Sequence, residues 1–553
     1  MFPRKNIVLL AVAFSLAMPS AVIAAESHGA GTEVSSGFYN PVIWADVPDP
    51  DVIRVGDDFY MVSTTMHLMP GCPVMRSRDL VNWTTVGYVF DSLNDTPRYS
   101  LEGGTVYGKG QWATSIRYRD GRFYVLFSPN DEPYRSYIYT TEDPSGHWDL
   151  LCRTEHFHDS SLLLDDDGRA FVFSGGGNIR LTELNPDLTG VLPGGVDKVV
   201  IRPDSTETGL HEGSRVIKHA GKYYAFVISW PAGKPRRQLC YRADNIEGPY
   251  EKCVVLESEF GGFPYVGQGC IVDDTDGNWW GMIFQDRGGV GRVLTLNPCE
   301  WKDGWPMLGD ADGKVPSRVD KTICHVPGSG VCASDEFEDG KMSVLWQWNH
   351  NPDPAGWSLT ETPGRLRLVN TKTSSNLFEA RNTVSQRMEG AYGDASVKIN
   401  VADMKNGDIA GFAAFNGDTG LVSVEAGEGR KWIVARATSV SLGGKSHEIT
   451  GVEDREMERL EFNGEEIWFR ITTDFTPGRD IAEFYYSLDG EDWHRVGQPF
   501  KMIFDYRRFF MGTRYALFNY ATLTPGGAIS VDWFRVKTSR DSGGMSAYMT
   551  ENI

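Results

Sequence analysis

Residues 46–62 read DVPDPDVIRVGDDFYMV, and this stretch holds both a structural and a chemical signal. Its second half consists of two apolar runs around a Gly-Asp-Asp turn, which predicts two strands joined as a hairpin. In its first half, Pro48 and Pro50 restrict the backbone on both sides of Asp49 and remove two hydrogen-bond donors. Asp49 is therefore expected on a stiff, non-helical segment that leads into a strand. Because an isolated aspartate beside proline usually belongs to a turn, its significance depends on the rest of the chain.

The pattern of a strand, a glycine turn and an aromatic-rich strand occurs five times. The turn glycines lie 47 to 65 residues apart, a spacing compatible with four-stranded propeller blades and variable loops. Single hairpins are marginal in water, so the copies must pack around a common axis. The sequence therefore predicts a five-bladed β-propeller over residues 37–315. The five copies are 52–62, 116–127, 162–173, 216–227 and 271–284, and additional turn signals for outer hairpins occur at 77–83, 142–148 and 243–250.

The second half of the chain has a different pattern of polar and apolar residues. Residues 316–333 are rich in small and turn-forming residues and are interpreted as a linker. Alternation of polar and apolar residues within 334–537 fits sheets with one buried face, so we expect a β-sandwich of the jelly-roll or lectin-like type. Residues 538–553 are expected to form a tail, and the fold class is all-β. The expected sandwich strands are 364–369, 394–401, 409–415, 466–473, 482–488, 508–518 and 528–536.

The N-terminus has the pattern of an export signal. Arg4 and Lys5 precede an apolar run over 7–18, and small residues follow up to Ala25. The apolar run is too short for a stable membrane span, and no later segment reaches that length. We therefore expect a signal peptide over 1–25 and an exported protein, periplasmic or extracellular, with no membrane partner.

Composition narrows the class of ligand. Asp and Glu number 74 against 54 Lys and Arg, a net charge of −20, which argues against nucleic acid as a partner. Aromatic residues make up 12% of the chain, which suits stacking on sugars as well as a β-sheet core. The eight cysteines lack the close pairs of a zinc site. Cys240 and Cys253 flank a turn and are compatible with either a cross-strand disulfide or two thiols.

Three acidic residues precede equivalent repeats. Asp49 comes before the first, Asp159 before the third and Glu212 before the fourth. The innermost strands of a propeller surround a central depression, so these carboxyl groups are expected to converge there. Glycosidic bond cleavage uses one carboxylate as base and one carboxylic acid as proton donor, and a third negative charge raises the pKa of that donor. Taken singly, Asp159 could cap a turn and Glu212 could be a surface charge.

Several motifs together resemble glycoside hydrolase family 43, in particular its β-xylosidase and α-L-arabinofuranosidase members with a C-terminal sandwich. The resemblance covers nearly the whole chain after residue 25. The motifs are NPV at 40–42, VPDPDVIRVGD at 47–57, TTMHLMPG at 64–71, SRDLVNW at 77–83, FQD at 284–286, GR at 291–292, WQWNHNP at 346–352 and YALFNYAT at 515–522.

The resemblance implies a role for each acidic residue. Asp49 would be the general base, Asp159 the orienting and pKa-modulating carboxylate, and Glu212 the general acid of an inverting, exo-acting enzyme. Trp112, His67, Gln268 and Arg292 are expected to bind substrate, with Arg292 near the base. His67 is expected to line the pocket, with a packing role as the alternative.

Two positions depart from the family pattern. Relatives often carry a histidine on the axis where this chain has Gly267, and many have another histidine where it has Arg287. The axial histidine commonly helps to hold calcium or ordered water. We therefore assign no metal ligands and expect no required cofactor, with calcium as the alternative.

The function predicted from the sequence is release of terminal α-L-arabinofuranosyl or β-D-xylosyl residues from hemicellulose. The expected partners are plant cell-wall polysaccharides, such as arabinoxylan, arabinan or xyloglucan side chains, or oligosaccharides derived from them. The alternative is a carbohydrate-binding propeller without catalysis. A retaining fructosidase is disfavoured because its first motif has Asn where this chain has Pro48. The sandwich is expected to support the propeller, with polysaccharide binding as the alternative.

Overall fold

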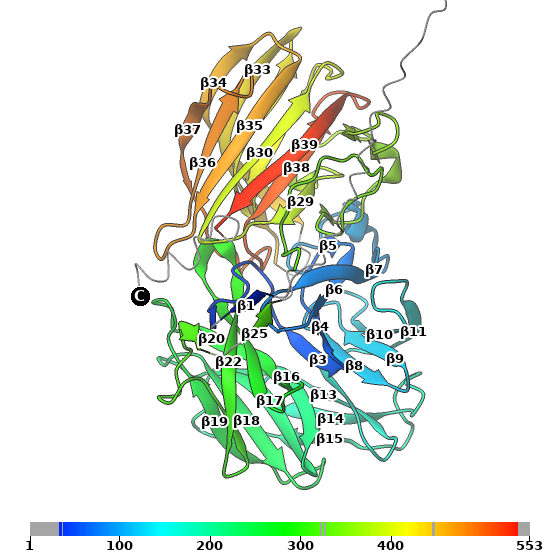
Figure 1. Cartoon of the computed structure of the whole chain (residues 1–553). Helices are drawn as coiled ribbons and strands as arrows, with labels where there is room; N and C mark the ends of the chain where they lie inside the picture. The colour runs from blue at the N-terminus through cyan, green and yellow to red at the C-terminus, as the bar shows by residue number, and fades with distance from the viewer. Residues whose placement is uncertain (1–32, 36, 321–322, 326–327, 445–447, 540–553) are drawn as a thin grey trace, which may run out of the picture.

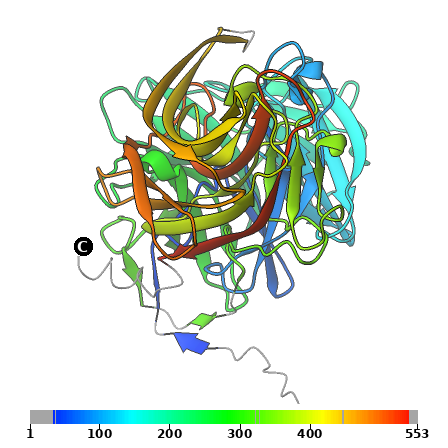
Figure 2. The ribbon, with the colours of Figure 1, turned by 90° about the horizontal axis from the view of Figure 1, so that it is seen from above.

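A computed structural model describes residues 33–35, 37–320, 323–325, 328–444 and 448–539. It has two bodies: a propeller, blue to green in Figure 1, and a sandwich, yellow to red, stacked on one end of it. The view from above in Figure 2 shows the sandwich strands lying over the blades. The expected signal peptide and residues 540–553 of the expected tail lie outside the described residues. None of the described helices is long and apolar enough to cross a membrane.

The propeller consists of five antiparallel four-stranded sheets, which confirms the predicted architecture. Blade 1 contains β3 (Asp51–Val55), β4 (Asp58–Val62), β6 (Gly71–Ser77) and β7 (Thr84–Phe90); blade 2 contains β8 (Ser115–Arg119), β9 (Arg122–Phe127), β10 (Arg135–Thr141) and β11 (Asp149–Glu155). Blade 3 contains β12 (Ser161–Leu164), β13 (Ala170–Ser174), β14 (Ile179–Leu184) and β15 (Asp197–Ile201); blade 4 contains β16 (Leu210–His219), β17 (Lys222–Trp230), β18 (Arg237–Ala243) and β19 (Glu251–Glu257). Blade 5 contains β20 (Val266–Asp273), β21 (Trp279–Asp286), β22 (Arg292–Lys302) and β23 (Trp305–Leu308).

Each of the five predicted hairpins forms the first two strands of one blade. The turn between β3 and β4 places Gly56 at φ 63°, and the turn between β16 and β17 places Gly221 at φ 77°. This left-handed conformation explains the glycines, because side chains with a Cβ rarely adopt it. The first strands of the blades, β3, β8, β12, β16 and β20, pack in a closed ring around the axis.

The segment that precedes Asp49 links blade 1 to blade 5. Val42 N donates to Leu294 O, and Leu294 N donates in return to Ile43 O, both at 2.9 Å. Val47 N donates to Arg292 O at 2.9 Å. The chain before blade 1 therefore runs along β22 of blade 5, which brings Asp49 beside Arg292.

The segment expected to be a linker also pairs with the N-terminal part of the chain. Two short strands within it, β24 (Arg318–Val319) and β25 (Ile323–His325), pair with β2 (Phe38–Tyr39) and β1 (Glu33–Ser35). Short 3-10 helices occur at η1 (Pro97–Ser100), η2 (Gly288–Val290), η3 (Pro354–Gly356) and η4 (Leu377–Glu379).

The C-terminal part is a sandwich of an eight-stranded and a seven-stranded antiparallel sheet, as predicted. One member of the larger sheet, β5, belongs to the propeller sequence and pairs with β26, so the two bodies share a sheet. The larger sheet has the order β34 (Ile449–Phe462), β33 (Arg430–Leu442), β32 (Asp418–Gly427), β31 (Asp408–Phe415), β38 (Arg514–Ala521), β29 (Val384–Arg387), β26 (Gln347–Asn349) and β5 (Leu68–Met69). The smaller sheet has the order β27 (Trp357–Ser358), β28 (Leu366–Val369), β39 (Ala528–Thr538), β30 (Tyr392–Asn400), β35 (Glu466–Asp474), β36 (Ile481–Ser487) and β37 (His494–Lys501).

Cys240 and Cys253 face each other across β18 and β19, as their spacing suggested. Both are thiols in this structure. The structure therefore supports the cross-strand placement and shows no disulfide between this pair.

Candidate active site

The three acidic residues are carried by the innermost strands of blades 1, 3 and 4. Asp49 lies two residues before β3, Asp159 two residues before β12, and Glu212 inside β16 at a register shift. Asp49 and Asp159 have φ of 54° and 46°, a conformation that costs energy for residues other than glycine. Both side chains are buried, and the charges of Asp49 and Glu212 both act on Asp159. The propeller therefore brings all three carboxyl groups together.

Asp49 is held as an acceptor. Thr64 Oγ1 donates to its Oδ2 at 2.6 Å, and Arg292 Nη1 lies 3.3 Å from its Oδ1. The side chains of Asp49 and Arg292 are 8% and 4% exposed, so this ion pair is largely shielded from water. A cation and a hydroxyl therefore fix the orientation of this carboxyl group.

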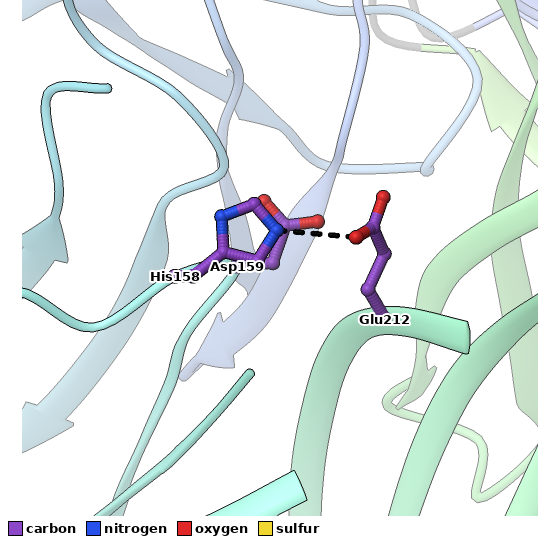
Figure 3. A group of neighbouring side chains, drawn as sticks. All are labelled: His158, Asp159 and Glu212. Carbon is purple, nitrogen blue, oxygen red and sulfur yellow. Dashed lines mark hydrogen bonds and ion pairs between the residues drawn. The ribbon is translucent and has the colours of Figure 1, made fainter. Parts of the chain in front are cut away.

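Asp159 and Glu212 form a second cluster with His158. Figure 3 shows the three side chains directed toward one another, with a contact of 3.1 Å between His158 Nε2 and Glu212 Oε2. Burial raises the pKa of Asp159 to about 7; the charges of Glu212 and Asp49 add to this effect, while His158 opposes it. Burial lowers the pKa of His158, but the charges of Asp159 and Glu212 outweigh burial and raise it to about 9.

Glu212 is not the surface charge that it could be in isolation. Its side chain is 24% exposed and contacts His158. Asp159 likewise lies in the turn before β12, as a turn-capping residue would, yet it is only 8% exposed and interacts with both other carboxylates. The cluster therefore contains a group that can hold a proton near neutral pH beside a partly open carboxyl group.

Arg215 was not identified from the sequence, although it connects all three acidic segments. It is completely buried and donates to the backbone carbonyls of Asp49 at 2.9 Å, Ser160 at 3.4 Å and Ser214 at 2.7 Å. Ser160 follows Asp159, and Ser214 lies two residues beyond Glu212. The available signal was an arginine directly before the apolar pair Val216 and Ile217 of β16, three residues after the predicted acid.

Three of the predicted substrate-binding residues lie around the carboxylates. The Trp112 ring is half-buried, with its centroid 5.9 Å from that of His158. The Gln268 side chain packs against Gly213, the residue after Glu212, where a Cβ would approach to 2.4 Å. Arg292 contacts Asp49 as described above.

His67 does not lie in an open pocket. It is completely buried, and its ring packs against Tyr107, His350 and Phe509 with centroids 4.8 to 5.4 Å away. Burial lowers its pKa to about 3, so the ring is neutral in the folded protein. The structure favours the packing role that the sequence left as the alternative, at the junction of the two bodies.

The sandwich also reaches the site, through Phe510. Its ring centroid is 5.6 Å from that of Trp112, and its carbonyl accepts a hydrogen bond from Arg292 Nη2 at 3.2 Å. The Arg292 guanidinium lies 4.7 Å from the centre of the same ring. A residue more than 200 positions away in sequence therefore helps to orient the partner of Asp49, and no local pattern pointed to it.

An arginine side chain occupies the space next to the axial position. At Gly267, a Cβ would lie 3.2 Å from the Arg236 side chain, so an arginine occupies the space next to that position. Arg236 pairs with Asp286 at 2.7 Å. The Arg287 guanidinium packs over the Trp44 ring at 4.5 Å. These cations are unsuited to holding a second positive charge. Among the described residues, one group of three His, Cys, Asp or Glu side chains has its ligand atoms within 4.8 Å of one another: His158, Asp159 and Glu212.

Comparison with known proteins agrees with this geometry. Residues 38–306 match the family described as Glycosyl hydrolases family 43, and residues 334–537 match the Beta xylosidase C-terminal Concanavalin A-like domain. A beta-xylosidase of Formosa agariphila is 31% identical in an alignment that covers 94% of this chain and 93% of that protein. The chain belongs to glycosyl hydrolase family 43. This glycosidase is an exo-acting enzyme of the β-xylosidase/arabinofuranosidase type.

Other relatives of this family 43 enzyme are named for different activities. A non-reducing end alpha-L-arabinofuranosidase of Bacteroides ovatus is 28% identical over 68% of this chain and 73% of that protein. A solved family 43 hydrolase, engineered to display both endo-xylanase and exo-arabinofuranosidase activity, has a TM-score of 0.83 and 30% identity, covering 91% of this chain and 100% of that one. A bifunctional GH43-CE protein of Bacteroides eggerthii has a TM-score of 0.83 and 39% identity, covering 91% of this chain. The chain spans 64% of that longer protein.

Proposed function

We propose that this enzyme releases terminal α-L-arabinofuranosyl or β-D-xylosyl residues from hemicellulose, or from oligosaccharides derived from it, with inversion at the anomeric carbon. The observation that carries the proposal is the meeting of Asp49, held by Arg292, with the Asp159 and Glu212 cluster at one end of the propeller axis. Xylose- and arabinose-containing carbohydrates are the substrates named for its relatives.

The proposed mechanism assigns one proton transfer to each side of the sugar. Asp49 accepts a proton from a water molecule as that water attacks the anomeric carbon. Glu212 donates a proton to the departing glycosidic oxygen, which keeps the electron pair of the broken bond. Inversion requires the two carboxyl groups to stand about 6.5–9.5 Å apart so that the water fits between them and the sugar. Asp159 is assigned the orienting and modulating role, because it is buried beside Glu212 and interacts with its charge.

The test compares aryl α-L-arabinofuranoside with aryl β-D-xyloside as substrates. Wild type is expected to hydrolyse at least one of them, and proton NMR should detect the inverted anomer first. Asp49→Asn should lose about 100-fold or more in kcat on either substrate, because the base is removed. The surface variant Asp57→Asn is the matched control. Absence of turnover by wild type would contradict the proposed substrates, and initial retention would contradict the role of Asp49.

We also propose that catalysis requires no cofactor. The support is the Arg236 side chain, which lies next to Gly267 at the axial position and disfavours a cation there. Dialysis against EDTA should leave kcat and the unfolding temperature unchanged. Loss of activity that only added calcium restores would contradict this proposal.

Export to the periplasm or the extracellular space is proposed from the pattern of residues 1–25 alone. Cell fractionation followed by N-terminal sequencing of the mature protein tests it. A cytoplasmic protein that retains its first 25 residues would contradict it.

A further inference from the structure

The proposed general acid has a neighbour that neither the motifs nor the family comparison assigned. His158 Nε2 lies 3.1 Å from Glu212 Oε2, and Figure 3 shows the edge of the imidazole facing that oxygen. The contact joins the turn before blade 3 to the first strand of blade 4. Among the described residues none hydrogen-bonds the other oxygen, Oε1. One side of the carboxyl group is thus anchored while the other can face a ligand.

The loop 175–177 builds the space in which this pair meets. A Cβ at Gly176 would lie 3.6 Å from His158 Cδ2, an ordinary contact, but only 3.1 Å from Glu212 Oε2, so a side chain there would shift the Glu212 carboxyl group. Gly175 N donates to His158 O, and Gly177 N donates to the carbonyl of His211, the residue before Glu212, both at 2.8 Å. The backbone of this one loop therefore fixes the positions of both His158 and the segment that carries Glu212.

The charges around His158 make it a donor. Asp159 and Glu212 stabilise its imidazolium form, and its pKa of about 9 keeps the ring positive at neutral pH. The other histidine nearby is His156, whose pKa is lowered by burial and by the charge of His158. Trp112 approaches the ring without adding charge.

Two more charged groups act on the cluster from neighbouring blades. Asp49 and Arg215 both influence Asp159, with opposite signs. They are common to every variant proposed below, so differences between variants report on the His158–Glu212 contact.

We propose that His158 is a positioning residue that acts through Glu212. Its Nε2–H binds Oε2, directs Oε1 toward the glycosidic oxygen and stabilises the carboxylate that forms as the proton leaves. This inference rests on the general-acid role proposed for Glu212. In the step concerned, the Oε1–H bond breaks, the proton bonds to the leaving oxygen, and that oxygen keeps the electron pair of the glycosidic bond. His158 retains its own proton throughout.

The contact also defines which step depends on His158. A charged donor hydrogen-bonds most strongly to a carboxylate, and Glu212 becomes a carboxylate only as its proton moves to the leaving oxygen. Loss of His158 should reduce kcat/KM most when the leaving group needs a full proton transfer.

The experiment measures kcat/KM for two aryl glycosides of the same sugar, one with a dinitrophenyl and one with a phenyl leaving group. His158→Ala should lose about 10- to 100-fold on the phenyl glycoside, because a charge-assisted hydrogen bond is removed. On the dinitrophenyl glycoside, which departs without protonation, it should lose less than about 3-fold. The limbs of the kcat–pH profile should also move, because the charged partner of Glu212 is removed.

Two further variants separate this role from a structural one. His158→Gln retains an N–H donor without the charge and should recover part of the loss. His156→Gln changes a half-buried histidine two residues away and should leave both substrates and both pH limbs unchanged. Thermal unfolding of each variant verifies that the fold is intact.

Equal losses on the two substrates in His158→Ala, with unmoved pH limbs, would overturn the inference. Glu212→Gln distinguishes this result from failure of the proposed function. If Glu212→Gln loses activity steeply on the phenyl glycoside while His158→Ala does not, only the role of His158 fails. If Glu212→Gln also shows no dependence on the leaving group, the assignment of the acid fails as well.

Discussion

Arg215 is a cation that water does not reach, and backbone carbonyls are its main partners. Its nearest carboxylate is Asp51, at 3.8 Å from Nε. An unsolvated charge is tolerated only when its donors are satisfied, and the carbonyls that satisfy it belong to the segments carrying Asp49, Asp159 and Glu212. At the residue scale, the position of the site thus depends on one completely buried side chain.

Replacing Arg215 by methionine should damage both stability and catalysis. Methionine has similar bulk but no donors, so several buried carbonyls lose their partner, and we expect the free energy of unfolding to fall by about 2–4 kcal/mol. Because the three acidic segments are no longer tied together, kcat should fall at least about 10-fold. Urea unfolding and kcat measure the two effects. Arg78→Met, at an exposed ion pair, is the control. Full kcat in Arg215→Met would contradict the proposal that Arg215 holds the three acidic segments together.

Asp159 should make the protein less stable at high pH than at low pH. Its folded pKa of about 7 exceeds the ordinary aspartate value, so between about pH 4 and 7 the folded state binds a proton that the unfolded state has lost. Stability therefore falls as pH rises through that window. Asp159→Asn should be more stable than wild type by about 1–3 kcal/mol at pH 8 and equal to it at pH 4. Denaturant unfolding at both pH values tests this, and an equal difference at both would contradict it.

At the scale of elements, the sequence predicted strands correctly where polar and apolar residues alternate clearly or where a glycine turn joins two apolar runs. The β3–β4 hairpin follows from its glycine turn and the apolar runs on both sides. The β33–β34 hairpin was not predicted, although its strands span 13 and 14 residues. Strand β34 is a sheet edge with mostly exposed, charged residues, so it lacks the buried alternate positions that identify a strand. Its position instead depends on pairing along β33 and on ion pairs such as Arg459 with Glu425.

The loop after β13 provides a prediction at the same scale. Gly176 leaves the space between His158 and Glu212, and its φ is not in the left-handed region, so alanine is compatible with the backbone. Gly176→Ala should leave the unfolding temperature nearly unchanged but lower kcat about 10-fold, because the new methyl group displaces the Glu212 carboxyl group. Gly168→Ala tests a glycine whose Cβ would meet nothing but whose φ is 89°, so it should lower stability without lowering kcat. The reverse pattern would contradict the steric argument.

At the scale of the whole molecule, the sandwich is part of the active-site framework. Asp46 accepts from Arg292 N at 2.8 Å and from Gly512 N at 3.0 Å, so one carboxylate joins blade 5 to the sandwich. Phe510, two residues before Gly512, contacts Trp112 and Arg292. Strand β5 adds a direct backbone connection between the two bodies. These contacts favour the supporting role expected for the sandwich.

Asp46→Ala should therefore affect stability and activity together. Two buried backbone N–H groups would lose their acceptor, and we expect the free energy of unfolding to fall by about 2–4 kcal/mol. Arg292 would also lose part of its support, so kcat/KM should fall several-fold while the exposed control Asp57→Ala remains unaffected. Denaturant unfolding and steady-state kinetics measure both effects. Normal stability and activity in Asp46→Ala would show that the sandwich is dispensable for the site.

The sequence alone determined the repeat, its turn glycines, the two-body all-β architecture and the three acidic residues, because each of these depends on short-range patterns or on motifs. It also placed Arg292 and Trp112 near the carboxylates. Only the tertiary structure decided which distant groups surround them: Arg215 beneath the acids, Phe510 from the sandwich, and His158 against Glu212. It also placed His67 in a buried cluster. Such contacts arise when separate blades and sheets close on one another, and no residue spacing along the chain encodes that closure.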